Sequence, residues 1–200
     1  YNFHNLYKEL LNFCTVDLSA FYFDIRKDTL YCDPKDSKKR KSTLLLLNVI
    51  LNSLLKWFAP ILSFTTEEIY QLVSKSKKSI HLEKFLNFPK QFENTKLYEK
   101  WLKLILIRDT CNLSIEEKRA SKEIGSSLES SLQIELPKEL FKIFKDVDFA
   151  ELCIASSVKV KENSENEIKV LTTKAFGKKC PICWKISQEG CQRPNCELKR

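Results

Sequence analysis

Residues 43–70 read TLLLLNVILNSLLKWFAPILSFTTEEIY, and this stretch predicts one long helix, its end and the start of the next helix. In its first half, apolar residues recur every three or four positions, as in a helix with one buried face. These residues are Leu44, Leu47, Ile50, Leu51, Leu54, Leu55 and Phe58. Pro60 ends the helix, because proline has no backbone N–H and its ring clashes with the preceding turn. Thr65-Thr66-Glu67-Glu68 contains a Thr-x-x-Glu capping box, so we expect a second helix to begin there.

Further helices are predicted on both sides of this stretch. Apolar residues at helical spacing begin at Phe3, Asp17-Leu18-Ser19 interrupts them, and a second helix then runs to Ile25. Another long amphipathic helix is expected over residues 94–122. Four or five amphipathic helices with short links predict an α-helical bundle over residues 1–124.

The pattern changes at Gly125. Residues 131–136 alternate apolar and polar like a strand, and Pro137 begins a short helix. Three more strands are expected at 152–156, 158–161 and 168–172, with a hairpin turn at 162–167 between the last two. The predicted fold class is therefore mainly α: a helical bundle, a small α+β unit over residues 125–175, and a cysteine-containing tail over residues 176–200.

The composition excludes several classes of protein. Three glycines in 200 residues cannot form a phosphate-binding loop, which needs several glycines close together. The two histidines, His4 and His81, have no metal ligand or triad partner at a useful spacing, so we assign no catalytic residue. No apolar run approaches the ~20 residues of a membrane span. Because there is no methionine, we expect the chain to be a segment of a longer protein.

Positive charge is concentrated at the two ends of the chain. The net charge is +8 overall: +5 over residues 1–90, −1 over residues 91–175 and +4 over residues 176–200. Such a field suits a polyanion, most commonly a nucleic acid. A lysine-rich surface without a polyanionic ligand is the alternative that the charge alone leaves open.

Four of the eight cysteines lie within the last 21 residues, at positions 180, 183, 191 and 196. Two pairs of cysteines on loops can provide four thiolates for a tetrahedral zinc ion. The sequence therefore predicts one structural zinc per chain, held by Cys180, Cys183, Cys191 and Cys196, with no open position for water. Two disulfides are the less favoured alternative, because the other four cysteines are scattered among apolar residues. The tail is too small to have its own core, so metal binding and folding of the tail are expected to be one event.

Four segments resemble a known family. DLSAFYFDIRKDTLY (17–31) and WFAPILSFTTEEIY (57–70) resemble runs in the anticodon-binding helical domain of class I aminoacyl-tRNA synthetases. Arg108-Asp109 with EIGSSLE (123–129), and CPICW (180–184), are similar to segments typical of the bacterial isoleucyl branch. That branch usually ends with a second Cys-x-x-Cys after a longer loop, whereas here seven residues separate the pairs and four separate Cys191 from Cys196.

The resemblance implies a C-terminal segment of isoleucine–tRNA ligase, an enzyme that joins isoleucine to its tRNA with ATP and Mg²⁺. It implies that this segment anchors the anticodon stem-loop of tRNA-Ile and lacks the catalytic and editing centres, so that the segment alone has no active site. The second implied partner is the remainder of the synthetase. ATP and Mg²⁺ belong only to the parent enzyme. The resemblance also implies that this enzyme is a cytoplasmic monomer that contacts no membrane.

Candidate RNA-binding residues are the basic clusters and one tryptophan. Phosphates are bound by lysine and arginine, and unstacked bases by aromatic planes. The candidates are Lys38, Lys39, Arg40, Lys41, Lys178, Lys179, Trp184, Lys185 and Arg193. A solvated helix start is the alternative for residues 38–41. For the Trp184 side chain two interpretations stay open: it stacks on a base, or it packs against the metal site.

Two other functions are weighed against tRNA anchoring. One is a freestanding zinc-containing nucleic-acid-binding module, similar to the tail of a DNA glycosylase, which carries a related knuckle. The other is a helical scaffold for protein partners, whose basic surface is incidental. The glycosylase reading needs its own N-terminal catalytic residue, and a chain that opens with Tyr1 and a helical bundle does not provide one.

Overall fold

The computed structural model describes residues 2–74, 78–191, 193 and 196. Contacts divide the chain into two compact units, Tyr1–Glu93 and Asn94–Arg200. The long helix of residues 95–120, which the sequence pattern groups with the bundle, belongs to the second unit. The predicted domain boundaries at residues 124 and 175 stay a prediction.

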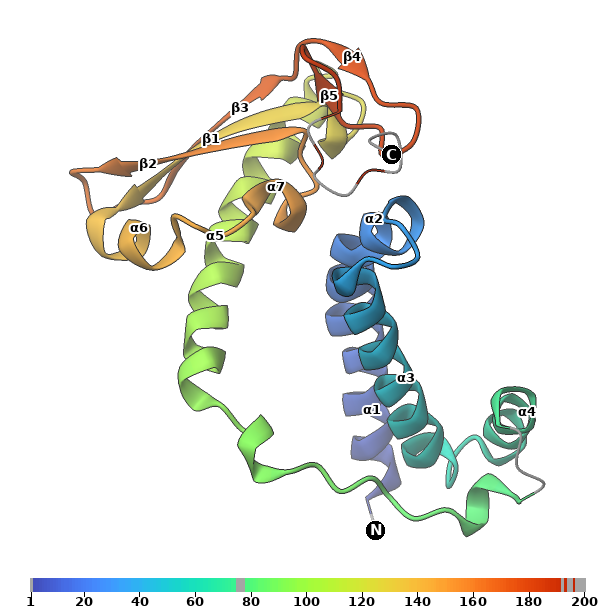
Figure 1. Cartoon of the computed structure of the whole chain (residues 1–200). Coiled ribbons are helices and arrows are strands. Elements are labelled where there is room, and N and C mark those ends of the chain that lie inside the picture. The colour runs from blue at the N-terminus through green and yellow to red at the C-terminus, as the bar shows by residue number, and fades with distance from the viewer. Residues whose placement is uncertain (1, 75–77, 192, 194–195, 197–200) are drawn as a thin grey trace. The chain divides into compact units, whose positions relative to one another are not determined.

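The first unit opens with one uninterrupted helical rod (Figure 1). It consists of α1 (Phe3–Asn12), the π-helical η1 (Phe13–Phe23) and α2 (Asp24–Cys32). The predicted interruption at residues 17–19 is therefore wrong. Asp17 and Ser19 are exposed and Leu18 is buried, so the polar pair lies on the outside of the rod. The wider π-helical turns change which positions face inward, which breaks the pattern without ending the helix.

The predicted long helix is confirmed as α3 (Lys38–Phe58). Ser37 caps it, because its hydroxyl accepts from the backbone N–H of Arg40 at 3.4 Å, and Pro60 lies just beyond its end. Next come α4 (Ser63–Val73) and two short 3₁₀ turns, η2 (Ile80–Leu82) and η3 (Lys90–Phe92). Side chains from α3, α4 and η2 form an apolar cluster at this end of the unit, namely Leu55, Ala59, Tyr70 and Ile80 with Leu51 against them.

The predicted capping box is wrong. Helix α4 begins at Ser63, before Thr65, and its N-cap Leu62 makes no side-chain cap. Glu67 instead accepts hydrogen bonds from the Ser79 hydroxyl at 2.8 Å and the Ile80 backbone N–H at 2.9 Å. The bond from Ser79 is the main reason why the pKa of Glu67 lies below its usual value. This carboxylate thus fastens the segment after α4 to the helix.

The second unit is a long helix followed by a small mixed sheet. Helix α5 (Thr95–Ala120) is capped by Asn94, and the 3₁₀ turn η4 (Ser127–Glu129) leads into β1 (Ser130–Pro137). Helices α6 (Lys138–Phe144) and α7 (Phe149–Leu152) connect β1 to β2 (Ser157–Asn163), and β3 (Lys169–Lys174) follows.

The sheet order is β2-β1-β3, with β1 parallel to β2 and antiparallel to β3. Two sequence predictions are corrected here. Residues 152–156 are not a strand, because α7 ends at Leu152 and Ile154 has a left-handed backbone with φ 54°. Residues 162–167 are not a hairpin turn, because β1 lies between β2 and β3. The helical crossover through α6 and α7 is what allows β1 and β2 to run parallel.

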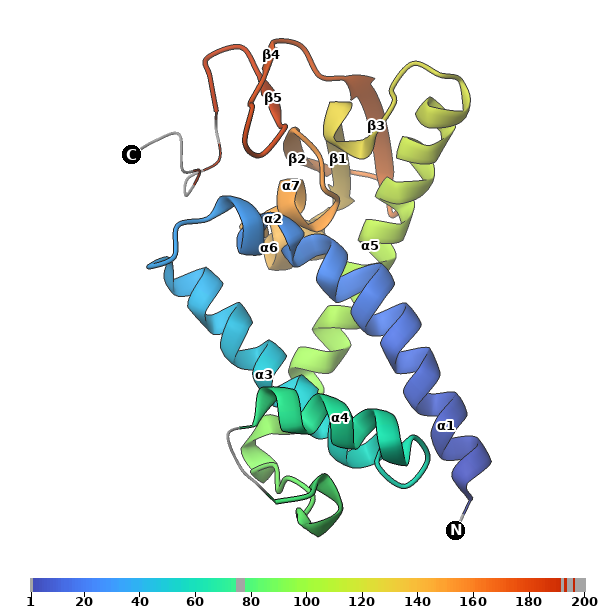
Figure 2. The same cartoon turned by 90° about the vertical axis from the view of Figure 1, so that its right-hand side faces the viewer.

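Helices cover one face of this sheet (Figures 1 and 2). Leu132, Ile134 and Leu136 alternate along β1 with half-buried residues and point into the core, where Phe144 of α6 and Phe149 of α7 are also fully buried. Helix α5 covers β3, where the hydroxyls of Ser114 and Thr172 are 2.7 Å apart. The opposite face of the sheet, which carries Ser131, Gln133 and Glu135, is only half-buried.

Two short strands complete the unit. Strands β4 (Lys178–Lys179) and β5 (Ile186–Ser187) pair antiparallel as a hairpin. Within the described part of the chain, no helix is both long and apolar enough to cross a membrane.

Candidate metal centre and basic surfaces

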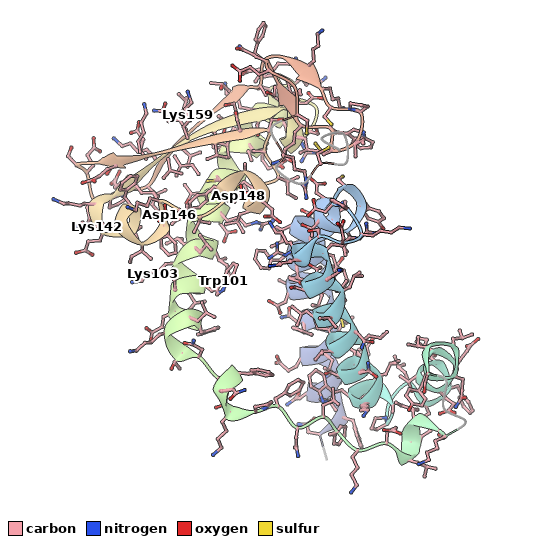
Figure 3. All side chains as sticks on the ribbon, in the orientation of Figure 1. Trp101, Lys103, Lys142, Asp146, Asp148 and Lys159 are labelled. Carbon is pink, nitrogen blue, oxygen red and sulfur yellow. The ribbon has the colours of Figure 1, made fainter. Side chains whose placement is uncertain are left out.

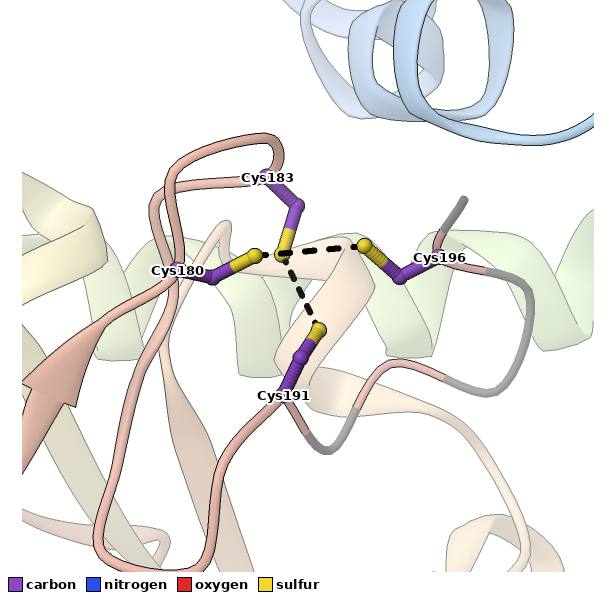
Figure 4. A group of neighbouring side chains, drawn as sticks. All are labelled: Cys180, Cys183, Cys191 and Cys196. Atoms are coloured by element: carbon purple, nitrogen blue, oxygen red, sulfur yellow. Dashed lines mark hydrogen bonds between the residues drawn. The ribbon is translucent and has the colours of Figure 1, made fainter. Parts of the chain in front are cut away.

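The four predicted cysteine ligands lie together, Cys180 and Cys183 on the turn of the β4–β5 hairpin and Cys191 and Cys196 beyond β5 (Figure 4). Cys183 and Cys191 have their sulfurs 3.5 Å apart, Cys180 and Cys196 have theirs 3.9 Å apart, and all four sulfurs lie within 4.8 Å of one another. A tetrahedral zinc site with Zn–S bonds of ~2.3 Å has sulfurs ~3.8 Å apart, whereas a disulfide has ~2.05 Å. The cluster therefore has the size of a metal site, and the shortened loop does not keep Cys191 and Cys196 away from it.

Backbone N–H groups donate to two of the four cysteine sulfurs, those of Cys180 and Cys183. Burial raises the pKa of the Cys180 thiol, but N–H donors from Cys183 and Ile182 and the neighbouring thiols outweigh it and lower this pKa to about 7. Burial raises the pKa of Cys183 above its usual value, and the N–H of Lys185 opposes that shift. Directed N–H donors and a readily formed thiolate are properties of a metal-binding knuckle.

The knuckle, which is the β4–β5 hairpin with the turn that carries Cys180 and Cys183, is held by one hydrogen bond to a residue beside β2 and by close contacts between its own two sides. The Ser156 hydroxyl, next to β2, accepts from the backbone N–H of Ile186 at 2.7 Å. Gly177 approaches the backbone of Ser187 so closely that a Cβ there would lie 2.3 Å from its carbonyl carbon and oxygen. Within the hairpin, the N–H of Cys180 donates to the carbonyl of Lys185 at 2.9 Å. The sequence pattern contained no signal for Ser156, whose partner lies 30 residues further along the chain.

Replacing Gly177 by alanine is expected to loosen the hairpin. Its φ of 133° and the contact with Ser187 both forbid a side chain, so the two strands must separate to accommodate a Cβ. Gly190→Ala is the matched control, because Gly190 also has a positive φ, 88°, but a Cβ added there would have no atom within 4 Å. Hydrogen exchange over residues 178–187 is expected to rise strongly in Gly177→Ala and little in Gly190→Ala. Equal exchange in the two variants would contradict the role of the close contact.

Trp184 stands on this knuckle with its side chain largely exposed. Its residue is 58% exposed, and its backbone is left-handed with φ 60°, an uncommon conformation for a bulky residue. Its N–H donates to the Cys180 carbonyl at 3.0 Å, and the ammonium of Lys179 lies 5.4 Å from the ring centroid. A tightly bonded backbone thus presents an aromatic plane beside a cation.

The other basic candidates of the tail have different surroundings. Lys178 and Lys179 are exposed on β4. Lys185 is half-buried, and its ammonium donates to the Ala150 carbonyl at 3.4 Å, so it also ties the knuckle to α7. Arg193, which lies between Cys191 and Cys196 in the sequence, is half-buried.

The cluster at residues 38–41 forms the first turn of α3. Lys38 and Lys41 are exposed, whereas Lys39 is half-buried. The Arg40 guanidinium donates to the Asp33 carbonyl at 2.8 Å and so closes the turn between α2 and α3. The N-terminus of a helix is itself electropositive and favours acidic residues, yet this first turn contains none. Four cations at that end oppose the helix dipole, and a bound anion would relieve the repulsion.

Comparison with known families identifies the first two thirds of the chain. Residues 1–136 match the anticodon-binding domain of tRNA ligase. The chain belongs to this family. The match includes the whole first unit, with its basic turn at the start of α3, and it ends within β1. The cysteine cluster of this anticodon-binding family member therefore lies beyond the matched residues.

Curated relatives of this anticodon-binding chain are isoleucine–tRNA ligases. The chain is 64% identical to that of Pelagibacter ubique over 96% of its own length, and 40% identical to that of Methylacidiphilum infernorum over 94%. It is 36% identical to the ligase of Bartonella henselae, again over 94% of its length. It spans only about a fifth of each relative, 20–21%.

Proposed function

We propose that this chain is the tRNA-anchoring segment of an isoleucine–tRNA ligase. The observation that carries the proposal is membership of the anticodon-binding family together with relatives of that name over nearly the whole chain. The segment binds the anticodon stem-loop of tRNA-Ile, while the remainder of the ligase joins isoleucine to the tRNA with ATP and Mg²⁺. It acts in the cytoplasm as part of a monomeric enzyme.

Anchoring needs sequence-independent phosphate contacts and a smaller number of base contacts. Lys38 and Lys41 are exposed at an electropositive helix end, which suits a phosphate. Arg40 and Lys185 act indirectly, since their side chains hold the turn and the knuckle from which neighbouring residues reach the RNA. Lys39, Lys178, Lys179 and Arg193 extend the basic surface of their own units.

The cysteine cluster holds one structural zinc ion in this proposal. The donor set supports it, because four thiolates favour zinc and the sulfur spacing fits its tetrahedron. Zinc, when bound, crosslinks the hairpin to the segment that carries Cys191 and Cys196. The knuckle then gives Trp184 a fixed support from which its ring can stack on an unpaired base.

Removing the two exposed lysines of α3 is expected to weaken tRNA binding in a salt-dependent way. In Lys38→Ala/Lys41→Ala the slope of log K against log salt should fall by about 2, at ~0.9 for each lost phosphate contact. Fluorescence anisotropy titrations with labelled tRNA-Ile at several salt concentrations measure this slope. Lys8→Ala/Lys90→Ala is the matched control, because it removes two exposed charges from the same unit.

Other outcomes of this titration identify the alternatives. Equal slopes of log K against log salt for both double variants would show that the basic turn at residues 38–41 does not contact the tRNA. Preference for a DNA duplex of equal length over tRNA-Ile would favour a DNA-binding module. RNA affinity that ignores ionic strength would favour a protein scaffold.

A further inference from the structure

A groove of about 430 Å³ lies where the sheet meets the β4–β5 hairpin. Its floor is the end of the sheet face that the helices leave uncovered, and its wall is the segment Ile186–Glu189. Apart from Ser131, its lining lies beyond residues 1–136, so the family match assigns nothing to it. Its volume is within the range of small-ligand sites and is large enough for one nucleotide.

The floor of the groove carries hydroxyl groups and lysine. Ser131 pairs in register with Ser157 of β2 and Thr173 of β3, which places the three hydroxyls in one row across the sheet. The hydroxyls of Ser131 and Ser157 are 2.7 Å apart. Lys159, in the next row, lies on the same face as these hydroxyls and away from Lys142 of α6 (Figure 3). The Thr173 hydroxyl donates to the Ser131 carbonyl at 3.3 Å, and one of the Ser131 and Ser157 hydroxyls donates to the other. This end of the sheet therefore offers one remaining hydroxyl donor, hydroxyl oxygens as acceptors, and a cation to a ligand.

Phe176 forms the aromatic rim of the groove. Its residue is 80% exposed, which is unusual for a large apolar side chain and leaves the ring faces accessible. Phe176 also lines a second hollow, which shares Lys174 and Gln188 with the first and adds Lys178. An exposed aromatic residue thus lies between two depressions, with lysines on either side of it in sequence.

We propose that this groove binds one unstacked nucleotide of a single-stranded RNA segment. The base stacks on Phe176, Lys159 and Lys174 contact the flanking phosphates, and the hydroxyl row hydrogen-bonds to the ribose and phosphate. Gln188 and Glu189 on the wall provide acceptors for base amino groups. This assignment rests on the proposed function, since it gives tRNA a contact site in the second unit.

RNA fits these features better than an acidic peptide does. A peptide carboxylate can use the lysines, but it gains nothing from an exposed ring. A nucleotide uses the ring, the hydroxyls and the cations together. The combination of stacking plane and basic groove is typical of sites for single-stranded nucleic acid.

The test uses the whole chain and a fluorescent, unstructured oligouridylate, followed by anisotropy. Phe176→Ala is expected to weaken binding about fivefold or more, which is the lower end of what one stacked base contributes. Lys159→Ala/Lys174→Ala should reduce the salt slope by about 1.4, at ~0.7 for each single-strand phosphate contact. Leu171→Ala is the apolar control on the same sheet face, since Leu171 is 58% exposed but does not line the groove. Lys142→Ala/Lys145→Ala is the charge control on and after α6.

The outcomes separate this proposal from the proposed function. Unchanged oligouridylate binding in Phe176→Ala and Lys159→Ala/Lys174→Ala overturns the groove assignment, whereas tRNA-Ile binding that depends on Lys38 and Lys41 leaves the proposed function intact. Absence of tRNA-Ile binding by the unaltered chain overturns the proposed function. In that case the groove assignment is kept only if oligouridylate binding still depends on Phe176. Stronger displacement of the probe by polyglutamate than by unlabelled oligouridylate overturns the nucleotide as ligand.

Discussion

Replacing Cys180 and Cys183 together by serine is expected to abolish metal binding and unfold the knuckle. The unaltered chain should carry about one zinc ion, held by four thiolates, whereas two serines leave an incomplete ligand set. Structural zinc contributes ~10–16 kcal/mol to the folding of small zinc domains, far more than the hairpin's few hydrogen bonds supply. Metal analysis of the purified chain measures the zinc content directly, and hydrogen exchange over residues 178–187 measures the unfolding.

The helices should survive this change, because no cysteine of the cluster contributes to the apolar core around Leu55 and Tyr70. Far-UV circular dichroism is expected to keep its helical signal. Cys14→Ser makes the same chemical change at a half-buried position outside the cluster and should leave the zinc content unchanged. Cys191→Ser alone should also lose zinc, since its sulfur lies 3.5 Å from that of Cys183. An undiminished zinc content in the double variant would exclude Cys180 and Cys183 as ligands.

Local signals in the sequence predicted the long helices well. The predicted span 94–122 agrees with α5 at Thr95–Ala120 to within two residues, and Asn94 caps it by accepting from the Leu97 N–H at 3.0 Å. Ser37 and Pro60 delimit α3 in the same way. Caps and breakers act within a few residues of their own position, so their effect can be deduced from the sequence alone.

Features that depend on distant partners were not predictable. Glu67 has the spacing of a helix-capping residue, yet its carboxylate binds Ser79 and Ile80, 12 and 13 residues further along the chain. Strand order is also a tertiary property. Two consecutive strands joined by a polar turn favour a hairpin, but β1 offers its two edges to β2 and β3 and separates them.

The candidate metal site was predictable because residue type and spacing suffice to suggest ligands. Two cysteines separated by two residues can both reach one metal ion from a single turn, so this half of the site is a local property of the sequence. The roles of basic residues were not predictable to the same degree, because exposure and partners decide them. Arg40 and Lys185 have the same charge as Lys38 and Lys178, yet both donate to backbone carbonyls of their own unit.

Trp184→Gly is expected to separate RNA binding from stability of the knuckle. A left-handed backbone costs a non-glycine residue roughly 1–2 kcal/mol, and glycine adopts it freely. Because the residue is 58% exposed, losing the ring removes little buried surface. Zinc content and thermal stability should therefore stay the same or rise, whereas affinity for tRNA-Ile should fall about tenfold, within the ~1–3 kcal/mol of one stacked base.

Trp184→Phe is the matched control for this experiment, since it keeps an aromatic plane on the same backbone and should retain most of the RNA affinity. The two readings of Trp184 predict opposite results. A ring that packs against the metal cluster would lose zinc in Trp184→Gly at unchanged RNA affinity, and that result would remove Trp184 from the interface. If the ring stacks on a base, Trp184→Gly should instead show reduced affinity for tRNA-Ile and an unchanged zinc content. This result would agree with a strained backbone that holds an aromatic side chain in solvent.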